Sequence, residues 1–357
     1  MASQILGGKL EALSKQFRYF SEKVYPGSSP LYQQLAARIA EDHEILTLAS
    51  EARKGELVPN LFFGAIHFLL LQGANHPLSA FFPSVSHSSS TDDDPYPYFR
   101  SFSLENDKRI GHLLSSRRVQ TNEVQRCACL LPAFGLVARE SPRRPLSIVD
   151  IGASAGLNLL WDRYGYDYGT GGGKHGDPNS PVQISCALRG ELRPPIPEIL
   201  PPVESRVGID LNPIDVRNPE EMLWLRSLVW PEHTRRGELL QRAIGLAKQE
   251  PPLVVAGDVL DVLPDVLSGL PGETTICLFH SHTVYQFPQE LRDRLSSLIV
   301  EHSRDRNVFE VSFEWWRGKD QPLLELSRVH EGNREEEVLA YCNPHGEWLQ
   351  WTRRDHP

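Results

Sequence analysis

Acidic and histidine side chains follow several short apolar segments of this 357-residue chain. Asp150 lies in LSIVDI, Asp210 ends SRVGID, Asp258 follows PPLVVAG, and TICLF leads into His280-Ser281-His282. Carboxyl ends of parallel strands meet at one edge of a sheet, so these side chains are expected to gather there. Carboxylates accept hydrogen bonds from hydroxyl groups, and imidazoles exchange protons near neutral pH. The pattern therefore predicts small-ligand binding with proton-transfer chemistry.

The turn after Asp150 has the sequence GASAG, from Gly152 through Ser154 to Gly156. A bare turn that opens a helix lets a ligand reach backbone N–H groups and the positive helix end. The pattern differs from G-x-G-x-x-G and from the lysine-containing phosphate loop, so neither a dinucleotide nor ATP is the expected ligand. The alternative is that the two glycines only permit tight packing of a helix on a strand.

The acids of the next two segments fit a nucleoside. The Asp210 carboxylate suits the two hydroxyl groups of a ribose, and Asp258 lies where an adenine edge is often bound. More residues separate Asp210 from the glycines than is usual for a ribose-binding acid. A proline-rich insertion between the two strands explains this separation. We therefore expect an adenosine-bearing ligand across this edge of the sheet.

His280 and His282 are the candidate catalytic residues. Residues two apart on a strand share a face, so both side chains can enter one pocket and either can act as a general base. Alternatively, one caps the strand and the other is merely exposed. An H-x-H pair also ligates metals, with Glu314 or His175 as a third ligand, but neither is nominated strongly and no metal site is predicted.

Two further segments hold candidate substrate-binding residues. In NLLWDRYGYDYG, Asn158, Trp161 and Tyr164 either line a substrate pocket or pack on the sheet. In TNEVQRC, Asn122 and Arg126 either bind an anionic substrate group or cap a helix and form a structural ion pair.

The order of these segments predicts the fold. Residues up to about 141 have helical spacing, and SPRRP ends that pattern. Short β-branched runs then alternate with helical segments, which is typical of a parallel sheet covered on both faces. The segments PLLELSRVHEG, REEEVLAYCNP and HGEWLQW follow one another without a helix. We expect an α/β fold with a doubly wound, mostly parallel sheet and antiparallel C-terminal strands, preceded by an all-helical region.

Two domains follow from this order. Residues 1–145 are expected to form a helical lid or substrate cap. Residues 146–357 are expected to form the α/β domain, with a proline-rich insertion at about 165–205.

The composition limits which binding partners and which cellular compartment we expect. Lysine and arginine number 37 against 46 acidic residues, for a net charge of −9, which argues against nucleic acid. The most apolar segment, LFFGAIHFLLLQG, is too short to span a bilayer, and the N-terminus does not read as a signal peptide. Five scattered cysteines do not form a disulfide framework. A cytoplasmic protein acting on a small molecule is expected, and the oligomeric state is left open.

The whole motif string resembles a known family, the domain-of-unknown-function family 2332. The resemblance runs from GSSPLYQQLA almost to the C-terminus and is carried by TNEVQRC, IVDIGASAGLNLLWDRYGYDYG, VGIDLNPIDV, LVWP, GDVLDVLP, FHSHTVYQFP and NPHGEWLQW. It implies a class I methyltransferase-like, Rossmann-type domain behind a helical region.

Carried over to this chain, the S-adenosylmethionine pattern has three parts. Asp150, Gly152, Ser154 and Gly156 surround the methionine end, while Asp210 lies at the ribose and Asp258 near the adenine.

The leading hypothesis is an S-adenosylmethionine-dependent methyltransferase, or a relative using that pocket, that acts on a small molecule. One rival is a hydrolase, lyase or decarboxylase on the same fold, metal-assisted or not, that works through His280 and His282. Another rival is a ligand-binding protein without catalysis.

Overall fold

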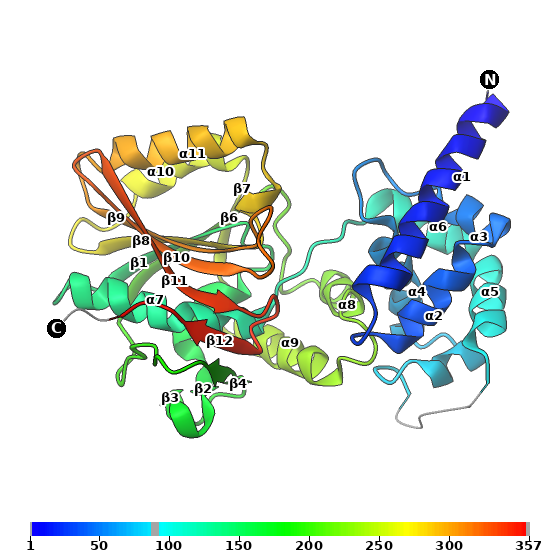
Figure 1. Ribbon diagram of the computed structural model, residues 1–357, viewed down its shortest axis with the longest axis horizontal. Helices are drawn as coiled ribbons and strands as arrows, with labels where there is room; N and C mark the ends of the chain where they lie inside the picture. The colour runs from blue at the N-terminus through cyan, green and yellow to red at the C-terminus, as the bar shows by residue number, and fades with distance from the viewer. Residues whose placement is uncertain (1, 87–92, 355–357) are drawn as a thin grey trace. The chain divides into compact units, whose positions relative to one another are not determined.

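The computed structural model describes residues 2–86 and 93–354 and the side chains from residue 7 onward (Figure 1). Contacts divide the chain into two compact units. Unit 1 comprises Met1–Thr121 and Asn218–Glu238, and unit 2 comprises Asn122–Arg217 and Leu239–Pro357.

Unit 1 is helical. Its elements are α1 (Ala2–Tyr19), η1 (Phe20–Val24), α2 (Pro30–Ile39), α3 (His43–Ala49), α4 (Val58–Leu71), η2 (Pro77–Phe81), α5 (Pro95–Glu105), α6 (Asp107–Ser116), α8 (Pro219–Ser227) and the first residues of α9 (Thr234–Ala247). The helices begin where the sequence offers caps: Ser29 accepts from the Tyr32 N–H, and Asp42 accepts from the N–H groups of Glu44 and Ile45.

Helix α4 forms the centre of the unit 1 core. Residues 58–70, Asn60 apart, are buried in it. Helix α8 packs against α4 and brings Trp224 and Leu228 into the same core, although it comes from the middle of the chain. No helix within residues 2–86 and 93–354 is both long and apolar enough to cross a membrane.

Unit 2 is built on a nine-stranded sheet in the order β5-β12-β11-β10-β9-β8-β1-β6-β7. The strands are β1 (Leu146–Ile151), β5 (Ala187–Arg189), β6 (Val203–Asp210), β7 (Leu253–Ala256), β8 (Thr275–Ser281), β9 (Val308–Glu314), β10 (Leu323–His330), β11 (Asn333–Cys342) and β12 (Trp348–Trp351). Strands β7, β6, β1, β8 and β9 are parallel, and β9 through β12 form an antiparallel series. Strand β5 adds in parallel to β12.

The remaining elements of unit 2 are shorter or lie on the faces of the sheet. They are η3 (Val124–Arg126), α7 (Cys127–Glu140), η4 (Leu157–Arg163), η5 (Gly169–Gly171), α10 (Val259–Ser268), η6 (Val284–Gln286) and α11 (Gln289–His302), with a small sheet of β2 (Gly165–Asp167), β3 (Lys174–Gly176) and β4 (Gln183–Ser185). Helices α10 and α11 cover one face of the large sheet and α7 the other (Figure 1).

The α/β class is confirmed, with N-terminal helices and a mostly parallel sheet that ends in antiparallel strands. The chain order reverses at β1, because β6 and β7 lie on one side of it and β8 and β9 on the other. Helix α7, expected within the helical region 1–145, lies in unit 2, and residues 218–238 lie in unit 1. The segment NLLWDRY forms the 3₁₀ element η4 rather than an α-helix, with left-handed Gly156 as its N-cap.

Candidate functional site

The glycine turn follows β1 at the point where the strand order reverses. Its backbone is left-handed at Gly152 (φ 82°), Ser154 (φ 55°) and Gly156 (φ 70°). The Gly152 N–H donates to the Ile209 carbonyl at 2.8 Å, and the Ser154 N–H donates to Oδ2 of Asp210 at 2.7 Å. Asp210 therefore fixes the path of the turn, a role that sequence reasoning did not assign to it.

Close packing accounts for both glycines. A Cβ on Gly152 would lie 2.3 Å from Oγ1 of Thr283, and one on Gly156 would lie 2.7 Å from the Pro252 ring. The alternative of helix–strand packing is therefore favoured at Gly156, whereas Gly152 packs against the loop residue Thr283. The contact also brings the turn against the loop that follows β8.

Ser154 is the unusual residue of the turn. A left-handed conformation is costly for a residue with a Cβ. The side chain is 2% exposed, and within the described chain its Oγ has no hydrogen-bond partner. Strain and an orphaned polar atom at one residue are typical of functional sites.

The other predicted nucleoside contacts differ in character. Asp150 is 3% exposed, and burial, followed by the negative charge of Asp210, raises the pKa of its carboxyl well above the ordinary value. Asp210 also accepts the Asn212 N–H at 2.8 Å. Asp258 is exposed and accepts the Leu260 N–H at 2.9 Å as the N-cap of α10. The neutral form of Asp150 is thus favoured, whereas Asp258 has a capping role.

His280 lies between two buried acids. Its Nδ1 is 2.6 Å from Glu314 Oε1, and its Nε2 is 3.3 Å from Glu310 Oε1. Burial alone lowers the pKa of the imidazole, but the hydrogen bonds and charges of Glu310 and Glu314 outweigh burial and raise it to about 10. Arg334 of β11 forms an ion pair with Glu310. His280 is therefore a cation at neutral pH, which favours a structural role over that of a base.

His282 has the opposite character. Its backbone is left-handed (φ 56°), and its ring lies edge-on to Phe313 and Tyr285, with centroids 5.4 and 5.9 Å away. Burial, followed by the positive charge of Arg126, lowers the pKa of the imidazole to about 2. Its Nε2 is buried without a hydrogen-bond partner in the described chain. His282 is therefore a neutral, strained side chain with one unused nitrogen.

Three distant segments meet at His282. Arg126 donates from Nε to the Pro344 carbonyl at 2.9 Å and from Nη1 to the Ser281 carbonyl at 3.3 Å. His345 Nδ1 lies 3.4 Å from Glu123 Oε2. Glu123 and Arg126 are each 9% exposed. We call Glu123, Arg126, His282 and His345 the polar cluster.

Sequence reasoning did not nominate Glu123 and His345 as site residues. They lie in TNEVQRC and NPHGEWLQW, two of the segments that carry the family resemblance. A signal for the pair was therefore present in the motifs, but nothing in the sequence placed the two segments together.

The remaining predicted substrate-binding residues are buried, and within the described chain the Nε1 of Trp161 has no hydrogen-bond partner. Asn122 Oδ1 accepts the Leu157 N–H at 3.0 Å, and buried Asn158 accepts from the Cys127 thiol at 3.4 Å. Trp161 and Tyr164 are fully buried, and the Tyr164 hydroxyl donates to the Leu157 carbonyl at 2.6 Å. These contacts favour the packing alternative for the aromatic pair and the capping alternative for Asn122.

Among the described residues no group of three or more histidine, cysteine, aspartate or glutamate side chains is placed to hold a metal ion. His175, one of the two suggested third ligands, bonds instead to the carbonyls of Pro197 and Gly172.

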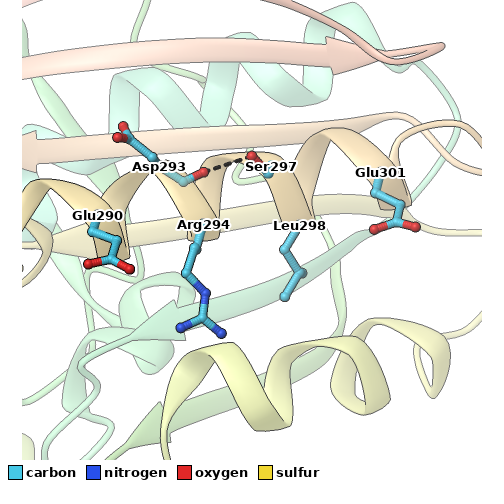
Figure 2. A pocket seen from close by; sticks show the side chains of 6 residues that line it. All are labelled: Glu290, Asp293, Arg294, Ser297, Leu298 and Glu301. Atoms are coloured by element: carbon cyan, nitrogen blue, oxygen red, sulfur yellow. Dashed lines mark hydrogen bonds between the residues drawn. The ribbon is translucent and has the colours of Figure 1, made fainter.

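A shallow surface pocket lies elsewhere, along α11 (Figure 2). Its lining comes from that one helix: Glu290, Asp293, Arg294, Ser297, Leu298 and Glu301. The Ser297 hydroxyl donates to the Asp293 carbonyl within it. The pocket shares no residue with the turn or the polar cluster.

No curated protein matches the sequence. The family model described as "Uncharacterized protein conserved in bacteria (DUF2332)" matches residues 14–351. That span includes the glycine turn, the polar cluster and nearly the whole of both units. The chain therefore belongs to the DUF2332 family.

Proposed function

We propose that the protein is an S-adenosylmethionine-dependent methyltransferase, or a relative that uses the same nucleoside site, with a small molecule as substrate and a class I methyltransferase-like α/β unit. The topology supports this assignment, because a doubly wound sheet binds ligands at the carboxyl ends of its strands where their order reverses. In this chain that place is between β1 and β8.

Ser154 is the observation that carries the proposal. A three-glycine turn would adopt left-handed angles without strain, and this chain keeps such an angle at Ser154 despite the Cβ. The buried Oγ has no partner in the described structure, so a ligand group beside the turn would satisfy it. This unpartnered hydroxyl supports the proposal that the turn would contact the cofactor.

Each residue has a defined task in this proposal. The Ser154 Oγ would contact the methionine end, since the N–H groups of Gly152, Ala153, Ser154 and Gly156 already donate within the protein. Asp210, which binds the Ser154 N–H, would accept from the ribose hydroxyls. When bound, S-adenosylmethionine supplies a methyl group on a positively charged sulfur. The raised pKa of the Asp150 carboxyl favours its neutral form at this site.

The polar cluster would orient the substrate. Thr283 packs against Gly152, so the loop with His282 borders the turn directly. The unused Nε2 of His282 can accept or donate one hydrogen bond to a substrate group, and Arg126 provides positive charge for an anionic one. Transfer then depends mainly on alignment and exclusion of water.

A second function has its own support in the Glu123–His345 pair. A carboxylate within 3.4 Å of an imidazole nitrogen can orient that ring for acid–base catalysis. Thr283 also fills space beside Gly152 that a ligand would otherwise reach. An acid–base hydrolase, lyase or decarboxylase that works at the polar cluster without a nucleoside is the alternative.

Calorimetry with S-adenosylmethionine and S-adenosylhomocysteine distinguishes the methyltransferase from the acid–base alternative. The proposal expects a Kd in the micromolar range, about −8 kcal/mol. Asp210→Ala should weaken binding about tenfold or more, because a ribose contact and the support of the turn are both lost. Asp265→Asn, an exposed acid on α10, is the matched control and should bind as wild type.

Absence of binding to the folded wild-type protein would reject the methyltransferase assignment and favour the acid–base alternative. If Asp210→Ala leaves binding unchanged, the nucleoside does not bind at the end of β6.

A further inference from the structure

Three thiols from distant parts of the sequence meet on one face of the unit 2 sheet. Cys129 on α7 lies near Cys186 and Cys342, since both of these thiols perturb the pKa of the Cys129 thiol. Its Sγ also lies 3.8 Å from the Trp348 carbonyl. All three residues are unpaired and buried, so cysteines that appear scattered in the sequence form a cluster in the fold.

The strand register explains the meeting. Cys342 is opposite Leu349 in the β11–β12 pair, and Cys186 immediately precedes Ala187, which is opposite Trp348 in the β12–β5 pair. Cys342 and Cys186 therefore flank β12 from its two sides, and Cys129 reaches them from the helix above.

The three thiols differ in how easily local unfolding exposes them. Cys342 ends a ten-residue strand and is 0% exposed. Cys186 lies between two three-residue strands and is 3% exposed. Short peripheral strands open locally at much lower free energy than the centre of a sheet. Cys186 is therefore the thiol that an oxidant meets first.

We propose that Cys129 and Cys186 form a reversible disulfide, which fastens the 165–205 insertion to α7 under oxidising conditions. A small-molecule disulfide supplies the oxidising equivalents. The Cys186 thiolate attacks one sulfur of that compound and releases one small thiol. The Cys129 thiolate then attacks the Cys186 sulfur and releases the second, so two protein thiols are oxidised and one disulfide is reduced to two thiols.

Burial sets the rate of this reaction. Hydrogen bonding to Cys129, together with burial, raises the pKa of the Cys186 thiol far above its ordinary value. The closed state is therefore nearly inert, and oxidation proceeds through brief openings of the insertion. The link would fix α7 directly behind Arg126 of the polar cluster, so the redox state could act on that site.

Peptide mapping of the full-length protein tests the proposal. Native protein is incubated with oxidised glutathione, the remaining thiols are alkylated, and the digest is analysed without reduction. The expected result is one linkage, Cys129–Cys186, which dithiothreitol reverses and which raises the melting temperature by about 5–10 °C. Cys277→Ser, which removes the buried thiol of β8, is the control and should leave the linkage intact.

Several outcomes would overturn the assignment. A Cys129–Cys342 linkage in wild type would exclude Cys186 as the partner. Glutathione adducts alone, or disulfide formation only in urea, would show that the native cluster does not close. Because the mapping uses wild-type protein, the result does not depend on whether a cysteine variant folds, and it is independent of S-adenosylmethionine binding.

Discussion

At the scale of single residues, the site combines strain with unusual protonation. Ser154 and His282 both have positive φ angles and both present a buried polar atom without a partner in the described chain. Burial and the charge of Asp210 raise the pKa of the Asp150 carboxyl, and Glu310 and Glu314 raise the pKa of His280 to about 10. Such departures cluster at functional sites more often than elsewhere.

Replacement of Ser154 by glycine should stabilise the protein. Glycine adopts φ 55° without the Cβ penalty, so Ser154→Gly is expected to raise the free energy of unfolding by about 0.5–1 kcal/mol in urea denaturation. Ser312→Gly, in the extended strand β9, is the control and should cost about 1 kcal/mol. Equal losses in both variants would show that the turn is not strained.

The pair of acids around His280 predicts a dependence of stability on pH. The pKa of His280 is about 10 in the folded protein against an ordinary 6.5, so its stabilisation is complete below pH 6.5 and is lost as the pH rises toward 10. Between pH 6 and 9 the wild type should lose on the order of a few kcal/mol, while His280→Asn gives a flatter profile. Chemical denaturation at each pH measures this.

His330→Asn is the control for that series, because His330 is exposed at the end of β10. It should keep the wild-type profile. A His280→Asn profile parallel to that of the wild type would show that His280 is not charged in the folded state.

At the scale of elements, α7 contains a proline whose effect another element compensates. Pro132 has no N–H to donate to the Ala128 carbonyl four residues earlier. The Tyr168 hydroxyl, which comes from the connection between β2 and η5, donates to that carbonyl at 2.6 Å. The insertion thus supplies the hydrogen bond that the helix cannot make.

A double-mutant cycle tests this compensation. Tyr168→Phe should cost about 1–2 kcal/mol, since the buried carbonyl loses its partner. In a Pro132→Ala background the helix can make its own bond, and the same change should cost less than about 0.5 kcal/mol. Equal costs in both backgrounds would mean that the carbonyl is satisfied in another way. Urea denaturation measures all four proteins.

Strand identities were predictable from the sequence, whereas the partners of the site residues were not. The runs ending at Asp150, Asp210 and His280 become β1, β6 and β8 because short β-branched segments between helices have few alternatives. The charged state of His280 depends on Glu310 and Glu314, of which only Glu314 was considered from the sequence, and then as a possible metal ligand rather than as a partner of His280. Their alternation in FEVSFE was the available signal, since it places both acids on one face.

At the scale of the whole molecule, the first unit is discontinuous in sequence. The Trp224 indole donates to the Arg118 carbonyl at 2.9 Å, and buried His67 bonds to the Ser227 carbonyl at 2.9 Å. A segment such as NPEEMLWLRSLVW between two strands reads as a crossover helix of the sheet. Sequence spacing could not reveal that it completes another core, because the match depends on side-chain shape.

A fragment comparison tests this dependence. Residues 1–121 alone expose the apolar side of α4 and leave His67 without the Ser227 carbonyl, so they should lack near-ultraviolet dichroism and a cooperative urea transition. The same fragment joined by a flexible linker to residues 218–238 should recover both. Cooperative unfolding of 1–121 alone would contradict the role of α8.

The late arrival of α8 also matters during synthesis on the ribosome. The N-terminal helices emerge first, but residues 122–217 are translated before their missing partner appears. At about 5–20 residues per second this is a delay of roughly 5–20 s. Throughout that interval a nascent chain exposes the apolar surface of α4, so chaperone binding and aggregation are expected to increase when translation is slow.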